Sequence, residues 1–235
     1  MGKVIMSGIV PQLEEPVTFA ENFADNTWEQ IIEACQKNKV PETWVVGDQK
    51  PMTINGTNYT IDIIGKNHDV YSDGSGTAPL TFQMHDCYAT AYAMNSEATN
   101  AGGWASSAMR TMHLPAIMAL MTSEVQAGVK EVKKLTCQGT YGSAVGGIAD
   151  KLFLLSEIEV FGGITYSTTG EGTQFDYYKA GNSKVKKMNG SADTWWLRSP
   201  FSKSNSSNFI QVSSSGDVNA YNPKNAYSVA FAFCF

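Results

Sequence analysis

Hydrophobic residues in the first part of the chain follow the spacings of amphipathic helices and short strands. Four of them recur at i, i+3, i+4 and i+7, which is one face of a helix: Trp28, Ile31, Ile32 and Cys35. Asn26 precedes this set and Glu29 lies three residues further on, which predicts a capping box and a helix over residues 27–37. Helical segments are also expected at four later places: residues 106–121, where Pro115 either breaks the helix or begins a second one, from Ser123, from Ser156 with Glu159, and over 174–180.

Strands are predicted where β-branched and aromatic residues form short runs. Residues 52–54 and 59–64 flank Asn55-Gly56, and this dipeptide favours a hairpin because both of its residues can take positive φ. Other short apolar runs predict strands at three further places: 44–46, 80–85 and 152–155. Helices ahead of many short strands and long loops indicate the α+β fold class.

The length allows one large domain, or a domain with a small N-terminal module. Residues 1–24 are irregular, with two prolines and an acidic pair. They are predicted to form an extended N-terminal arm, which is a candidate for homo-oligomer contacts or attachment. Residues 25–235 are expected to form a single domain, and no internal repeat is visible in them.

Composition and charge exclude several classes of protein. The net charge is −5 and basic residues gather only in pairs, which argues against a nucleic acid partner. No apolar run approaches the ~20 residues of a membrane-spanning helix. Residues 4–10 are apolar but short, broken by Gly8 and followed by Pro11, so they lack the pattern of a secretory signal and the protein is expected to be made in the cytoplasm.

Metal-ligating and nucleophilic residues show no spacing that indicates a catalytic or metal site. The four cysteines form no CxxC pair and are predicted to be free, buried thiols: Cys35, Cys87, Cys137 and Cys234. Two groups with the ligand types of a metal site follow predicted strands: His68-Asp69 and His85-Asp86-Cys87. Two histidines without a fixed short spacing favour hydrogen-bonded structural roles instead. No metal, no cofactor and no catalytic residue are predicted, and phosphate-loop, dinucleotide-binding and hydrolase motifs are absent.

The last 41 residues, 195–235, combine two opposite patterns. Both ends, 195–200 and 229–235, are apolar, aromatic-rich and strand-forming. Between them, residues 201–228 hold eight Ser, five Asn and two Tyr, so three residue types fill 15 of 28 positions. Apolar residues interrupt this run at intervals, which predicts short strands joined by polar turns. Ser, Asn and Tyr are also the residues that antibody paratopes favour.

Alternation along these strands separates a buried frame from an outward surface. The frame is predicted from six apolar residues: Trp196, Phe209, Val212, Val229, Phe231 and Phe233. Trp195 and Arg198 are expected at its rim. Twelve residues are predicted to point outward together and to bind a ligand: Asn205, Ser207, Asn208, Gln211, Ser213, Ser215, Asp217, Asn219, Tyr221, Asn222, Asn225 and Tyr227. Tyr221 and Tyr227 are the expected anchors, because aromatic residues dominate such interfaces.

Four blocks of this segment carry a resemblance to a known family: residues 195–200 (WWLRSP), Phe209-x-x-Val212, Gly216 and residues 229–234 (VAFAFC). They resemble the C-terminal half of the variable proteins of diversity-generating retroelements, a bacterial and prophage family. The run DKLFLLSE at 150–157 extends the resemblance, which covers roughly residues 104–235. It implies a C-type-lectin-like fold, with early helices packed on a twisted antiparallel sheet with long loops. It also implies a variable region at about 195–235, where errors at template adenines scatter Asn codons to Asn, Ser, Tyr and Asp.

By this resemblance the protein is expected to be non-enzymatic and to bind a protein or glycan on a target cell. It would belong to a phage or prophage, in the virion as a tail or receptor-binding part, or be displayed on a surface. Two alternatives stay open: an inert structural virion subunit, and an oxidase of the formylglycine-generating type. The oxidases act through two cysteines, but the apolar neighbours of Cys234 favour a structural thiol. The Glu-Pro-Asn, Gln-Pro-Asp and Trp-Asn-Asp motifs of calcium-dependent lectins are absent.

Overall fold

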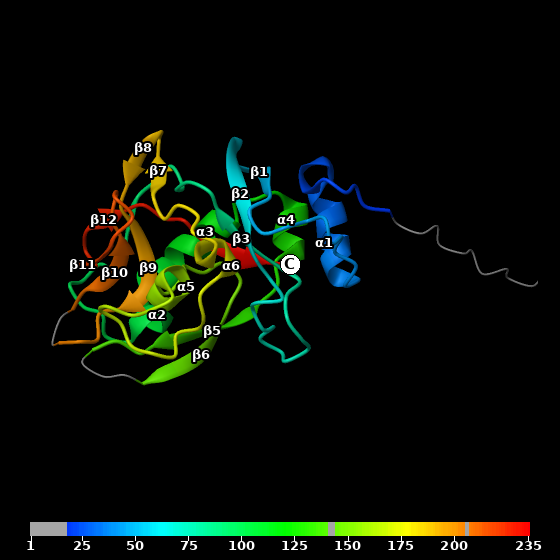
Figure 1. Cartoon of the computed structure of the whole chain (residues 1–235). Coiled ribbons are helices and arrows are strands. Elements are labelled where there is room, and N and C mark those ends of the chain that lie inside the picture. The colour runs from blue at the N-terminus through cyan, green and yellow to red at the C-terminus, as the bar shows by residue number, and fades with distance from the viewer. Residues whose placement is uncertain (1–17, 141–143, 205–206) are drawn as a thin grey trace, which may run out of the picture.

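The structure, a computed structural model, describes residues 18–140, 144–204 and 207–235. The helices are η1 (Phe23–Asp25), α1 (Trp28–Gln36), α2 (Gly103–Ser106), the π-helical η2 (Met109–His113), α3 (Leu114–Met118), α4 (Ser123–Gly128), α5 (Glu157–Phe161) and α6 (Asp176–Lys179). The strands are β1 (Gln49–Ile54), β2 (Thr57–Lys66), β3 (Leu80–Met84), β4 (Tyr92–Ala93), β5 (Val132–Cys137), β6 (Val145–Asp150), β7 (Lys186–Met188), β8 (Ser191–Asp193), β9 (Trp195–Pro200), β10 (Phe209–Val212), β11 (Val218–Tyr221), β12 (Ala226–Tyr227) and β13 (Ala232–Cys234). The fold is thus mixed α and β with small antiparallel sheets, as predicted for the α+β class (Figure 1).

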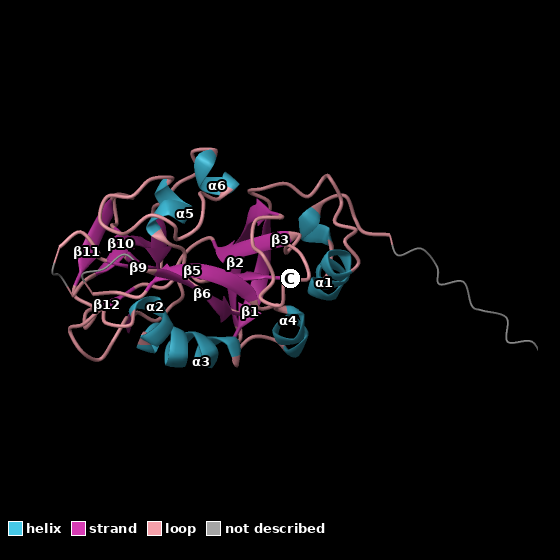
Figure 2. Ribbon diagram, turned by 90° about the horizontal axis from the view of Figure 1, so that it is seen from below, coloured by secondary structure: helices cyan, strands magenta, loops and turns pink. Residues whose placement is uncertain are grey.

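The sheet β1-β2-β3-β13 joins the two ends of the sequence. Its last strand, β13, pairs antiparallel with β3, so that Phe233 lies opposite Phe82 with ring centroids 5.2 Å apart. Phe23 stacks on Phe82 from the other end of the chain at 6.0 Å. Figure 2 shows the strands between α5 and α6 on one side and α2, α3 and α4 on the other. One hydrophobic core therefore runs from Phe23 to Phe235.

The predicted N-terminal arm meets this core at its end. Phe23 is fully buried and Phe19 packs against the same core. Residues 1–17 of the arm lie outside the described residues. None of the helices in the described ranges has the length and apolarity that crossing a bilayer requires.

Local sequence signals predict the β1–β2 hairpin and the capped helices well. Asn55 and Gly56 both take positive φ, 49° and 75°, in the two-residue turn of the hairpin. Ser156 caps α5 with Glu159 as its reciprocal partner. The capping box of α1 lies one residue later than predicted, at Thr27 with Gln30. Asn26 is not that cap, because its buried amide donates to the carbonyls of the preceding turn instead.

Two predicted strands are wrong, and of the two alternatives predicted at Pro115 the structure bears out the second, a new helix whose first turn holds this proline. Residues 44–46 lie in a turn region, where the buried Trp44 indole donates to the Ala20 carbonyl 3.0 Å away. Residues 152–155 are fully buried but make only one bridge, between Phe153 and Ala232. The predicted helix 106–121 is divided into η2 and α3, and Pro115 lies in the first turn of α3, where its missing N–H costs nothing. Apolar runs predicted burial here, and tertiary packing decided the backbone.

Candidate ligand-binding surface

The predicted binding residues lie on and around the sheet β9-β10-β11, at the end of the molecule opposite α1 (Figure 1). β10 is the middle strand, and its Gln211 lies opposite Trp196 of β9 and Asn219 of β11. The chain then leaves this sheet and forms β12, which pairs with β4 so that Tyr227 lies opposite Tyr92. The C-terminal segment thus pairs with β4, a strand from a much earlier part of the chain.

Ten of the twelve predicted residues have exposed or half-buried side chains, and we call these ten the display surface. Seven of them are exposed: Ser207, Ser215, Asp217, Asn219, Tyr221, Asn222 and Asn225. Three are half-buried: Asn208, Ser213 and Tyr227. Asn205 lies outside the described residues. Whether these side chains bind a ligand stays a prediction.

The outward orientation predicted for Gln211 is wrong. Its side chain is 1% exposed, and within the described residues its Oε1 has no hydrogen-bond partner. All four residues of β10 are buried, so the strand is covered on both faces. Alternation separates inside from outside only where one face meets water, as it does on β11.

The frame is confirmed, and it is larger than predicted. All six predicted frame residues are fully buried. Trp195 and Arg198 were expected at the rim, but both are 0% exposed. The indole of Trp195 donates to the Lys184 carbonyl 2.9 Å away, and the indole of Trp196 donates to the Tyr92 carbonyl at 3.0 Å. These partners satisfy the polar edges of the rings and let them be buried whole.

The turns of the display surface are held by their own side chains. Between β10 and β11, the Ser213 amide donates to the Asp217 carbonyl at 2.8 Å, and the Ser215 hydroxyl donates to the Asp217 carboxylate at 2.8 Å. Gly216 takes φ +88° in this turn, a conformation that L side chains rarely adopt. In the next loop, Asn222 accepts from the Lys224 amide. Turns ordered before binding lose less entropy when a ligand is bound.

The two predicted anchors contact each other. Tyr221 and Tyr227 meet edge to face with centroids 5.4 Å apart, and Tyr227 meets Trp196 in the same way at 5.1 Å. Tyr221 is 39% exposed. Tyr227 therefore links the exposed Tyr221 to the buried frame.

A buried ionic cluster lies behind the frame. Arg198 of β9 pairs with Glu159 of α5, and it donates to the Glu171 carbonyl at 2.8 Å. Lys134 of β5 pairs with Glu159 at 2.8 Å and with Asp69 at 2.6 Å. All five residues are almost fully buried, so each charge depends on the others for compensation.

Burial and the two cations shift the pKa values of the three carboxyl groups of this cluster in different directions. Burial by itself raises the pKa of Asp69 and of Glu159, but Lys134 beside Asp69 and Arg198 beside Glu159 outweigh it and lower both pKa values. For Glu171 burial prevails over Arg198, and its pKa is raised. The three pKa shifts therefore differ in direction: the neighbouring cations favour the ionised forms of Asp69 and Glu159, whereas burial favours the protonated form of Glu171.

His85 and His68 contact neighbouring side chains, and the four cysteines are buried. His85 Nδ1 lies 2.9 Å from Asp62 Oδ2, and this hydrogen bond raises the pKa of His85. His68 stacks on Phe175 with centroids 3.9 Å apart. Within the described ranges, no three His, Cys, Asp or Glu side chains lie where they could share a metal ion. All four cysteines are buried and free, as predicted.

Burial raises the pKa of all four thiols, most clearly that of Cys234. For Cys87 and Cys35 the pKa reaches about 12. These thiols therefore stay protonated at neutral pH and are poor nucleophiles.

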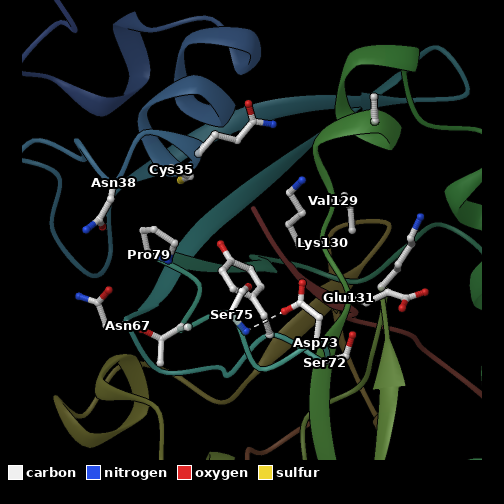
Figure 3. Close-up of a pocket in the computed structure, with 16 residues that line it drawn as sticks. Cys35, Asn38, Asn67, Ser72, Asp73, Ser75, Pro79, Val129, Lys130 and Glu131 are labelled. Atoms are coloured by element: carbon white, nitrogen blue, oxygen red, sulfur yellow. Dashed lines mark hydrogen bonds between the residues drawn. The ribbon is translucent and has the colours of Figure 1, made fainter.

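A cavity of about 860 Å³ lies away from the display surface, between the end of α1, the loop after β2 and the segment before β5 (Figure 3). Cys35 and Asn38 line one side, and Lys130 lines another. The Asp73 carboxylate, which lies in this loop, accepts a hydrogen bond from the Ser75 amide at 2.9 Å. The lining is mostly exposed and polar, and its charged side chains are of both signs.

Tyr59, Tyr88 and Tyr92 were not singled out in the sequence, although they continue the row of aromatic residues begun by Tyr221 and Tyr227. They come from three separate segments, and no periodicity joins them.

No curated protein and no solved structure matches the chain significantly. A family model described as a domain of unknown function (DUF6273) matches residues 80–234, from β3 to the end of β13. Because this match spans more than half of the chain, the protein belongs to that family.

Proposed function

We propose that the protein is a non-enzymatic ligand-binding protein whose display surface binds a protein or glycan on a target cell. The observation that carries the proposal is the division of the C-terminal segment. β9, β10 and β13 are fully buried, whereas seven of the ten display-surface residues are exposed: six on β11 and the adjoining turns, and Ser207 just before β10. Such a surface can change its side chains without disturbing the core beneath it.

The chemistry of this surface suits recognition. Its Ser and Asn residues offer adaptable hydrogen bonds, and Tyr221 offers a large contact area at a low entropy cost. The preformed turns at Asp217 and Asn222 reduce the ordering that binding requires. Together with the sequence resemblance, this supports a variable protein of the diversity-generating-retroelement type with a C-type-lectin-like fold. Its place would be the virion of a phage or prophage, or a cell surface.

The DNA downstream of the gene tests the proposal directly. A near-copy of the segment encoding residues 195–235, differing at adenines and followed by a reverse transcriptase gene, is expected. The differing codons should fall on display-surface residues such as Asn219 and Tyr221, and should spare Trp196 and Phe231. Differences spread equally over the frame and the surface, or no such copy, would contradict a diversified surface.

Binding supplies the second test. Fluorescently labelled protein is applied to a panel of intact bacterial cells, and the cells that bind it are then exposed to the Tyr221→Ala variant. Loss of cell binding with an unchanged melting temperature is expected. Asn219→Ala is the second variant. If both Tyr221→Ala and Asn219→Ala bind the cells as well as the wild type does, the binding site lies elsewhere.

A further inference from the structure

A row of tyrosines continues the display surface beyond the C-terminal segment. Tyr227 lies opposite Tyr92 across the β12–β4 pair. Tyr92 and Tyr88 then stack with centroids 6.5 Å apart, and Tyr88 stacks on Tyr59 of β2 at 5.5 Å. We call the row Tyr221, Tyr227, Tyr92, Tyr88 and Tyr59 the tyrosine strip. Four of its rings are exposed or half-buried, and only Tyr88 is buried.

An apolar helical face borders the strip. His113 of η2 stacks on Tyr92 with centroids 4.5 Å apart, and the preceding residue, Met112, is 64% exposed. Nine of the ten residues from 112 to 121 are apolar. Five apolar residues of η2, α3 and the turn after them are exposed, and we call them the apolar flank: Met112, Pro115, Ala116, Ala119 and Leu120. A helix that is apolar on all sides is normally buried on all sides, so this face lacks a cover.

We propose that the tyrosine strip and the apolar flank are the constant part of the binding site, and that the ligand is a protein that places apolar side chains on them. The inference rests on the proposed function. Apart from Tyr221 and Tyr227, these residues lie outside 195–235, so they would stay the same while the display surface varies. The site would then join a fixed apolar part to a changeable polar part.

Size and composition favour a protein over a glycan. A stable protein interface takes about 20–30 residues on each side, and the display surface, the tyrosine strip and the apolar flank together hold 18, most of that number. Aromatic residues and Met are enriched at the centre of such interfaces, and charged residues are depleted there. No residue of the strip or the flank is charged. A glycan laid on the flank would leave its hydroxyls without hydrogen-bond partners, which is costly.

The test uses full-length protein and two probes. A displayed library of short random peptides is selected on the wild type, and the wild type is also applied to a glycan array. Selected peptides should be rich in apolar residues. Their affinity should fall at least about tenfold for Met112→Glu and for Tyr221→Ala. The matched control is Val45→Glu, another exposed apolar residue (51%) outside the strip and the flank, and it should change affinity by less than about twofold.

Thermal melting of each variant shows whether it is folded. If Met112→Glu does not fold, Ala116→Glu replaces it as the flank variant. Peptides that bind the folded flank variant as well as they bind the wild type would overturn the inference, and so would a library from which no peptide is selected. Glycan binding that Tyr221→Ala abolishes and Met112→Glu leaves intact would also overturn it, while the proposed function would stand. If Tyr221→Ala alters no selected ligand, the display surface itself is wrong.

Discussion

β10 and β11 are neighbouring strands of one sheet and have the same length, yet their surroundings are opposite. Every side chain of β10 is buried, including the polar Gln211. On β11 the half-buried Val218 and Ala220 alternate with the exposed Asn219 and Tyr221. β10 lies between two strands and is covered on both faces, whereas β11 is the edge strand of that sheet with one face in water. The part of this sheet that meets water is therefore one strand wide.

The same contrast holds for polar groups. Arg198 on β9 is fully buried and is held by a carboxylate and by backbone carbonyls from three other segments. Asp217 is exposed, and its partners are its neighbours Ser213 and Ser215 in the same turn. A polar residue of the frame thus depends on distant parts of the chain, and one of the display surface depends on its own loop. Four predictions test this difference.

The largest effect is expected from Arg198→Met. The substitution would leave Glu159 with Lys134 as its remaining cation and would strand the carbonyls of Leu135 and Leu154. Removing one partner of a buried ion pair costs about 3–5 kcal/mol. Because the substitution also leaves carbonyls without donors, we expect a loss of about 5 kcal/mol for Arg198→Met. Urea denaturation measures the loss, with exposed Lys203→Met as the control. A loss below about 1 kcal/mol would mean that Arg198 is not held as described.

Phe231→Ala should lower the free energy of unfolding by about 3–4 kcal/mol, because it leaves a cavity in a close-packed aromatic core. Phe231 is fully buried and lies 6.5 Å from Phe233 between ring centroids. Tyr221→Ala removes an aromatic ring of similar size from the display surface and should change stability by only about ±0.5 kcal/mol. Equal losses in these two variants would erase the distinction between frame and surface.

The free energy of unfolding should depend on pH, and the contributions of Glu159 and Glu171 should have opposite signs. The folded-state pKa values of Asp69 and Glu159 are lowered, so their stabilising contribution is present above the unfolded pKa near about 4 and is lost as the pH falls through the folded values. The pKa of Glu171 is raised, so its contribution is present at low pH and is lost as the pH rises through the folded value.

Two variants check these opposite signs by urea denaturation across pH. Glu171→Gln should retain wild-type stability or exceed it at neutral pH, and the difference should shift in favour of the wild type as the pH falls. Glu159→Gln should be strongly destabilised at neutral pH, since it leaves Arg198 without its carboxylate. If both variants behave alike at neutral pH, the opposite pKa shifts of Glu159 and Glu171 are wrong.

The smallest effects come from a matched pair of cross-strand partners. Gln211 and Asn219 lie opposite each other, and either can be replaced by Tyr. Gln211→Tyr overfills a closed space and should cost about 1–3 kcal/mol. Asn219→Tyr points into water and should stay within about ±0.5 kcal/mol. Melting temperatures compare the two, and an equal tolerance at both positions would show that the display surface extends onto β10.

Local sequence determined the features whose physics is local. Asn55-Gly56 makes the first hairpin because only residues that accept positive φ fit its turn. Ser156 and Glu159 cap α5 because each supplies the hydrogen bond that the other's backbone lacks. The buried frame followed from apolar residues that no surface could accommodate, such as Phe231 and Phe233.

Tertiary structure alone decided everything that depends on distant partners. The charge on Arg198 made a rim position plausible, but the Glu159 carboxylate, 39 residues away, and carbonyls of three other segments compensate for its burial. The tyrosine strip joins Tyr59 to Tyr221 through segments from β2 to β11, and no spacing along the chain signals it. A sequence records which groups need burial or partners. Which distant segment meets that need is settled only when the sheets and helices pack together.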